Sequence, residues 1–457
     1  MSDRQPAGLP VALGLGIGVI GVVSMAILVA VESTDYNTWG ALVLAPLLVV
    51  VSLPILSRQA KRENDRRLFW LLVAALVLKL GGALVRDYIA FDVYGGQADA
   101  AVYHAEGARI SEQFRDGMFE TGLDNLTGGN FIRFVTGMLY TITGPTRLGG
   151  FVFYSWLGFW GLFLFYRAFT VAVPHGRSRT YAHLLFFLPS LLFWPSSIGK
   201  EAWMMFTLGI AAYGAARILS GMTVRGVTYA GLGMWLAAMV RPHMAGLVAL
   251  SLVVGILLRR PRASYRPLAF ISKLALLAVV VVASVVLVNQ TAEFFESSGF
   301  ETGGGVTGVL KQTAERTGSG GSSFEPSILQ SPARAPIAIV TVLFRPFLFE
   351  AGSAAAAAAA LEVTFLLALT VVRFPWFLSA IRSVREQPYV GLSLVYTGLI
   401  VLAFSSIANF GLLARERVQL FPFYLVLFSI PPRKGAHAPK HAQAEWRMDA
   451  AVARRSL

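Results

Sequence analysis

The chain alternates long apolar blocks with short polar connections. Blocks such as residues 9–31, 68–85 and 151–173 run almost without charge. A membrane-crossing helix needs about 20 apolar residues, whereas the strands of a membrane barrel show weaker alternating segments of about ten residues. The pattern therefore predicts an all-α polytopic membrane protein with about 11 transmembrane helices.

Basic residues between the blocks predict how the chain is oriented. Five of them crowd the connection that follows the second block: Arg58, Lys61, Arg62, Arg66 and Arg67. Cytoplasmic loops carry an excess of Lys and Arg, so this connection is expected inside the cell, and the N-terminus with it. The sequence thus predicts a multi-pass protein of the plasma (cell) membrane. The third span, residues 68–85, then leads to the extracytoplasmic side.

Three regions are expected along the chain. Residues 1–67 hold two spans and the basic loop, residues 68–430 form the membrane core, and residues 431–457 form a basic, disordered cytoplasmic tail. The core carries outer loops at about residues 86–150 and 289–336. Within the first loop, residues 131–144 are apolar but short, and a crossing there would place Arg177 and Arg179 outside. We expect an interfacial or re-entrant helix instead, so that the first outer loop is helical.

Composition narrows the functional classes. The mean hydropathy is +0.62, and 55% of residues are hydrophobic while 14% are charged. The net charge of +14 is explained by the cytoplasmic connections and the tail, so no nucleic-acid partner is expected. The chain has no cysteine, which excludes disulfides and thiolate chemistry. No nucleotide-binding loop or zinc-type histidine spacing stands at a sensible place.

Candidate chemistry gathers on the outer face. The stretch from Asp87 to Gly107 brings acids, a histidine and tyrosines directly after an apolar span. Three basic connections reach the same side, at Lys200, at Arg241 and at the Arg415/Arg417 pair. An acid that accepts a proton, beside cations that hold a phosphate, is what transfer from a lipid-phosphate-linked group requires.

Several motifs resemble those of GT-C-type membrane glycosyltransferases, near the protein O-mannosyltransferases and the bacterial polyprenyl-phosphate-sugar-dependent transferases. They are Asp99-Ala-Ala-Val-Tyr103-His104, the Pro189 to Glu201 stretch, Arg241-Pro242-His243 and Arg415-Glu-Arg417-Val-Gln-Leu-Phe-Pro422. The resemblance covers the layout of residues 68–430. It implies a polyprenyl-phosphate-linked sugar donor, an external site and a general base in the first loop. Two spans precede this loop and the adjacent acid pair of the mannosyltransferases is absent, so neither sugar nor acceptor carries over.

The predicted site follows from these motifs. Asp99 matches the general base, and His104 is a second catalytic candidate that more naturally orients or packs. Substrate-binding candidates are Asp92, Tyr103, Lys200, Glu201, Arg241, His243, Arg415 and Arg417. A divalent cation near Asp92 and Asp99 is a possible cofactor. Lys79, in the middle of a span, is expected to reach the interface or to meet Asp87 or Asp92.

The leading functional prediction is a glycosyltransferase. It would move a sugar from a polyprenyl-phosphate donor in the lipid bilayer to an acceptor, which could be a glycan, a lipid or a protein. A transporter or flippase of lipid-linked saccharides is one alternative, but it would distribute ionisable residues along the spans. A polymerase of lipid-linked glycans is another, and it would carry its main functional loop late in the chain.

Overall fold

The computed structural model describes residues 36–221, 223–258, 266–297, 299, 305–318, 322–326 and 332–432. The first predicted span, residues 9–31, and residues 433–457 of the predicted tail lie outside them. The described residues form helices, without a β-strand beyond one isolated bridge between Ser323 and Asn409.

The α-helices follow one another along the whole core. They are α2 (Tyr36–Arg62), α3 (Arg66–Tyr88), α4 (Asp99–Arg115), α5 (Gly128–Thr143), α6 (Arg147–Ala172), α7 (Ser178–Phe187), α8 (Pro189–Phe193), α9 (Lys200–Leu219), α10 (Thr223–Ala238), α11 (Pro242–Leu258), α12 (Arg266–Ser297), α13 (Gly305–Thr317), α14 (Ala335–Phe344), α15 (Ala354–Val372), α16 (Phe374–Ser383), α17 (Pro388–Phe404), α18 (Phe410–Glu416) and α19 (Phe421–Tyr424). Short turns complete them, namely the π-helical turn Ile89–Val93 after α3 and 3-10 turns at Trp194–Ser196, Pro332–Arg334, Leu348–Glu350, Arg417–Gln419 and Leu425–Phe428.

Five of the helices in the described ranges are long and apolar enough to cross a membrane, and the bent pair of α16 and α17 makes a sixth. The five are α2, α3 with its π-turn, α6, α9 and α15. The chain is therefore an all-α membrane protein. The figure of about 11 spans stays a prediction, because one of them is outside the described residues and others, such as α10, are shorter helices.

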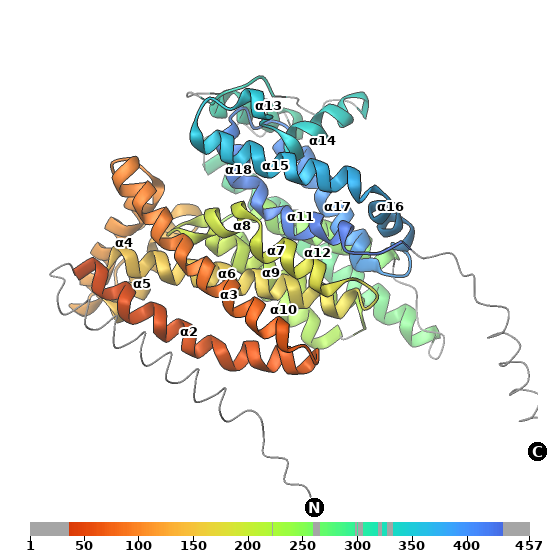
Figure 1. The fold of residues 1–457 in the computed structure, drawn as a ribbon, viewed down its shortest axis with the longest axis horizontal. Helices are drawn as coiled ribbons and strands as arrows, with labels where there is room; N and C mark the ends of the chain where they lie inside the picture. Colours follow the sequence, from red (N-terminus) through yellow and green to blue (C-terminus); the bar gives the residue numbers. More distant parts are fainter. Residues whose placement is uncertain are drawn as a thin grey trace, which may run out of the picture.

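Helices from early and late parts of the chain pack around α9. Figure 1 shows α2 to α6 on one side and α14 to α17 on the other, with α9 and α11 between them. α6 packs extensively on α9, and two glycines let the backbones meet. A Cβ atom added to Gly161 would lie 2.3 Å from the Met205 carbonyl oxygen, and one on Gly209 would lie 2.4 Å from that of Gly161. Small residues at a membrane helix crossing permit this approach.

One end of the bundle gathers basic residues from several connections. Arg179, in the first turn of α7, donates from Nε at 2.7 Å to the carboxylate of Asp65, which lies between α2 and α3. Arg177 and Arg373 both lie over the Trp376 ring, at 4.9 and 4.7 Å from its centroid. These contacts bring together connections that the charge pattern assigns to one side.

The opposite end gathers the connections assigned to the other side. α3 rises about 1.5 Å per residue, so Arg66 and Arg86 lie about 30 Å apart along it. Just beyond Arg86, Asp87 forms a two-pronged ion pair with Arg147 at the start of α6, with N–O distances of 2.8 and 3.1 Å. The Gly128 amide at the start of α5 donates to the Met239 carbonyl at 2.8 Å. Both ends of α5 therefore lie at this end of the bundle.

Lys79 does not behave as predicted. It is fully buried, and its Nζ donates to the carbonyl oxygens of Leu191 and Leu192 at 2.6 and 3.1 Å. These carbonyls belong to α8, just before the kink at Pro195, which has no N–H to donate to the Leu191 carbonyl four residues earlier. Asp87 is already paired with Arg147, so the expected acid partner is wrong and backbone carbonyls take its place.

One further segment differs from the sequence interpretation. Residues 420–430, which the apolar pattern predicts as the last span, form only α19 and a 3-10 turn at Leu425–Phe428, both buried among other helices. Proline at the second position of α19 and the short helical runs leave too little length to cross a bilayer as one helix. In the second outer loop, residues 305–317 form α13.

Candidate functional site

A network of ion pairs joins four predicted site regions at the end of the bundle opposite the basic connections. Arg415 on α18 donates from a terminal nitrogen to Asp99 at 2.8 Å and from Nε to Glu201 at 2.7 Å. Arg241 donates to Glu201 at 3.4 Å and to both oxygens of Glu416. The network therefore alternates acid and base, and it fixes α4, α9, α10 and α18 relative to one another.

The acids of the network differ in exposure. The Glu201 side chain is 6% exposed, whereas that of Asp99 is 58% exposed. Burial by itself lowers the pKa of Arg415, but the neighbouring carboxylates of Glu201, Glu416 and Asp99 together outweigh burial and raise that pKa above its ordinary value. Arg415 is therefore a permanent cation. Asp99 is the carboxylate of this network that a reactant can reach.

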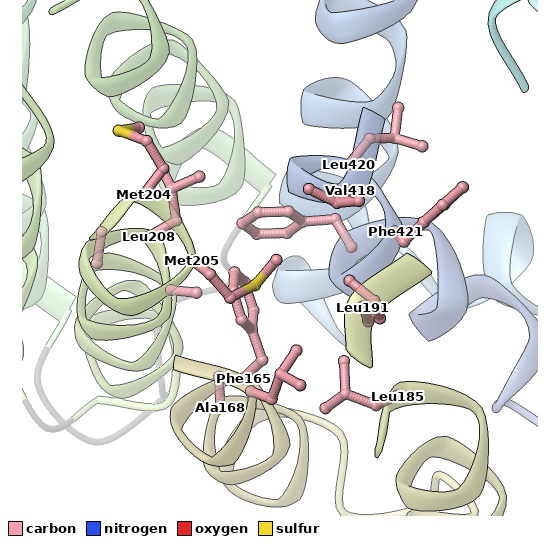
Figure 2. Close-up of a cluster of buried hydrophobic side chains, with 14 of the residues drawn as sticks. Phe165, Ala168, Leu185, Leu191, Met204, Met205, Leu208, Val418, Leu420 and Phe421 are labelled. Carbon is pink, nitrogen blue, oxygen red and sulfur yellow. The ribbon is translucent and has the colours of Figure 1, made fainter. Parts of the chain in front are cut away.

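A buried apolar cluster supports the network from below. Figure 2 shows Met205 of α9 and Phe165 of α6 pointing toward the segment that carries Val418, with Leu185 and Leu191 nearby. Glu201 stands one turn before Met205 on α9, and Arg415 stands three residues before Val418. Burial of apolar side chains stabilises by about 25 cal/mol per Å² of apolar surface, so this cluster holds the two charged positions together.

A cavity of about 280 Å³ opens beside the network. Asp99, Glu201 and Arg415 line it together with Arg86 of α3 and Trp194. A second, more open hollow shares its residues Tyr94, Gln97 and Ala98, so the turn between the π-helical segment and α4 forms the mouth of the cavity. Glycines at 95 and 96 have φ of +56° and +76°, which favour glycine and allow this tight turn.

Tyr103 and Lys200 lie next to the network. Tyr103 is buried next to two glycines. A Cβ atom added to Gly129 or to Gly199 would lie 3.5 or 3.8 Å from the Tyr103 side chain. Burial raises the pKa of Tyr103 well above its ordinary value, so its hydroxyl stays protonated. Lys200 begins α9, and its side chain also reaches Gly129.

Other predicted residues lie elsewhere. His104 points to the opposite side of α4, where its Nδ1 contacts the Tyr140 hydroxyl at 2.8 Å. Burial and the nearby Arg147 lower the pKa of His104. His243 packs against the Phe294 and Phe295 rings, with centroids 6.1 and 5.5 Å away. The structure thus brings neither histidine to the cavity, and their predicted roles remain untested.

Arg417 and Asp92 also stay apart from Asp99. The Arg417 side chain is buried and donates to the Arg345 carbonyl at 2.5 Å. Burial lowers the pKa of Arg417 to about 10. Asp92 is exposed on the π-helical turn and does not line the cavity. Among the described residues, no three His, Asp or Glu side chains are grouped to hold a metal ion, and the divalent cation stays a prediction.

Two residues of the site were missed from the sequence. Glu416 binds Arg241, and it also accepts from the Gln419 amide at 2.9 Å. Arg86 lines the cavity from the end of α3, and its guanidinium lies 4.7 Å from the Phe193 ring centroid and 5.1 Å from that of Trp194. The signal that the sequence offers for Arg86 is an arginine at the outer end of an apolar span.

No family model, curated protein or solved structure matches this chain. The resemblance to GT-C-type glycosyltransferases therefore rests on the sequence motifs alone.

Proposed function

We propose that the protein is a glycosyltransferase of the plasma membrane that uses a polyprenyl-phosphate-linked sugar at the outer leaflet. The fold is proposed to hold about 11 spans, with a cytoplasmic N-terminus and a helical first outer loop at residues 86–150. Support for this topology comes from the two opposite ends of the bundle. The predicted inner basic connections share one end, and Asp99, Glu201, Arg241 and Arg415 share the other.

The observation that carries the proposal is that Asp99 and Arg415 line one cavity. A base and a phosphate-binding cation must both reach the anomeric centre of the donor, and these side chains meet at 2.8 Å. Between them they supply a proton acceptor and a fixed positive charge. The mouth at Tyr94, Gln97 and Ala98 gives an acceptor access to Asp99.

In the proposed reaction, an acceptor hydroxyl oxygen attacks the anomeric carbon. The bond from that carbon to the phosphate oxygen breaks, its electron pair leaves with the lipid phosphate, and the hydroxyl proton passes to Asp99. The departing phosphate gains negative charge, which Arg415 and Lys200 stabilise. A phosphate that binds Arg415 also competes with Asp99 for its terminal nitrogen, and so leaves the carboxylate free to accept the proton.

Replacement of Asp99 by Asn tests this assignment. The amide keeps the shape and can still accept from Arg415, but it cannot take the proton. We expect turnover with purified polyprenyl-phosphate sugar to fall by about 10²- to 10⁴-fold, because general bases contribute about that much. Thermal stability should change little, since the Asp99 side chain is largely exposed.

Glu112→Gln is the matched control, because it removes an exposed carboxylate from the same helix without touching the cavity. Its turnover should equal that of the wild type. Full activity of Asp99→Asn, with donor and acceptor supplied, would refute Asp99 as the base. Equal losses in both variants would show that the general charge of the loop, and not a specific base, accounts for the effect.

A further inference from the structure

Arg86 differs from the other cations at the cavity. Arg415 and Arg241 each contact two carboxylates. Arg86 forms no ion pair with an acid in the described part of the chain, and its buried Nε has no hydrogen-bond partner there. A buried arginine normally has its donors satisfied, since an unpaired buried charge is costly.

The surroundings of Arg86 hold its guanidinium in place without neutralising it. The Phe193 and Trp194 rings lie beneath it, and such rings attract a cation but offer no acceptor to its N–H groups. The nearest network acids are engaged, because Glu201 accepts from Arg415 and Arg241, and Asp99 accepts from Arg415. The planar guanidinium is thus oriented, and its unpartnered Nε–H is left for another anion.

Geometry identifies the class of that anion. The cavity of about 280 Å³ is large enough for a phosphate group, and both Arg86 and Arg415 line it. The Arg86 guanidinium suits the multiple oxygens of a phosphate, because it can donate two parallel hydrogen bonds. Arg415 adds a terminal nitrogen, for which the phosphate competes with Asp99. The neighbouring α3 side chains of Leu84, Val85 and Tyr88 are exposed by 54%, 50% and 60%, so an apolar chain attached to the phosphate has a surface to follow.

We infer that Arg86 is the main ligand of a bound phosphate group in this cavity, with Arg415 as its second ligand. The inference rests on the proposed function for the identity of the lipid-linked donor, and it adds a residue and a position that the sequence motifs do not contain. The phosphate would sit between α3 and α18, at the aromatic floor formed by Phe193 and Trp194.

Binding of farnesyl phosphate to the full chain in nanodiscs tests the inference without any sugar transfer. Arg86→Gln should weaken binding by about ten- to a hundred-fold, which is the loss expected for a charge-assisted hydrogen-bonded contact. Farnesol, which lacks the phosphate, should bind wild type and variant alike. Arg133→Gln is the matched control, since Arg133 also has an unpartnered buried Nε but does not line the cavity. It should bind as the wild type does.

Wild-type affinity of Arg86→Gln for farnesyl phosphate would overturn the inference. If that variant does not fold, Arg86→Lys decides, because it keeps the charge but loses the planar guanidinium group. Farnesyl phosphate that binds this variant more weakly than the wild type supports the site. An unchanged affinity overturns it. Competition by inorganic phosphate separates the sources. Arg86-dependent binding of inorganic phosphate without binding of farnesyl phosphate would support the phosphate site and assign it to a soluble ligand.

The two proposals fail separately. Normal Arg86-dependent binding together with full turnover of Asp99→Asn would refute the proposed base and keep the phosphate site. Loss of turnover in Asp99→Asn together with unchanged binding in Arg86→Gln would refute the phosphate site and keep Asp99 as the proposed base.

Discussion

The Glu201→Gln variant probes the centre of the ion-pair network. Glu201 is buried, and its carboxylate accepts hydrogen bonds from Nε of Arg415 at 2.7 Å and from a terminal nitrogen of Arg241 at 3.4 Å. The substitution keeps the size of the side chain and one acceptor oxygen, but it removes the negative charge between two buried arginines. We expect a loss of stability, because the desolvation of the arginines is then only partly compensated.

The magnitude follows from the partners that remain. Removal of one member of a buried ion pair costs about 3–5 kcal/mol when the other charge is left alone. Here Arg415 retains Asp99 and Arg241 retains Glu416, so neither charge is left without an acid. The Gln oxygen also still accepts from Arg415. We therefore expect a loss of about 2–3 kcal/mol, below the full range for a broken pair.

Unfolding in mixed micelles with increasing sodium dodecyl sulfate, followed by tryptophan fluorescence, measures this loss. Glu106→Gln is the control, since the pair of Glu106 and Arg109 has a similar N–O distance of 3.1 Å but side chains 35% and 40% exposed. Such a pair contributes about 0.3–0.5 kcal/mol. If Glu201→Gln were no less stable than Glu106→Gln, burial of the network would not be the reason for its strength.

Two further outcomes test the packing and the pH response. Gly209→Ala should lower the free energy of unfolding by about 1–3 kcal/mol in the same assay, because its Cβ would press on the Gly161 backbone. Gly231→Ala is the control, since a Cβ there meets nothing within 4 Å and should be neutral or slightly stabilising. Equal effects of the two variants would contradict the close crossing of α6 and α9. The pKa of His104 is lowered in the folded chain, so the unfolded chain binds the proton first as the pH falls. The contribution of His104 to stability should therefore be fully present above about pH 6.5 and be lost as the pH drops below it. His104→Gln should flatten this fall, and an unchanged pH profile would show that His104 does not cause it.

The apolar blocks and the basic connections predict much of the architecture because each depends on local composition. The helices α2, α3, α6 and α9 stand where apolar blocks are expected, and the membrane requires every such block to satisfy its own backbone. The same alternation of sides brings Asp99, Glu201 and Arg415 to one end of the bundle. Their meeting therefore follows from the predicted topology, even though they are far apart in sequence.

Partners that depend on broken helices could not be predicted. Lys79 binds the carbonyls of Leu191 and Leu192 next to the kink at Pro195, which has no N–H to donate to the Leu191 carbonyl four residues before it. Arg86 forms no ion pair within the described ranges, and its sequence neighbour Asp87 pairs with Arg147. In both positions the decisive partner is a distant segment, and no local pattern distinguishes it from nearer alternatives.

The segment Arg415 to Arg417 shows where a geometric rule sharpens a sequence hypothesis. Successive helical residues are about 100° apart, so residues two apart point to nearly opposite sides and cannot both face one cavity. The three side chains indeed take three environments: Arg415 lines the cavity, Glu416 binds Arg241, and Arg417 is buried against the Arg345 carbonyl. Sequence spacing alone could thus have limited the phosphate contact to one arginine. The contacts of Arg415 with Glu201 and Asp99 in the folded chain identify it as that arginine.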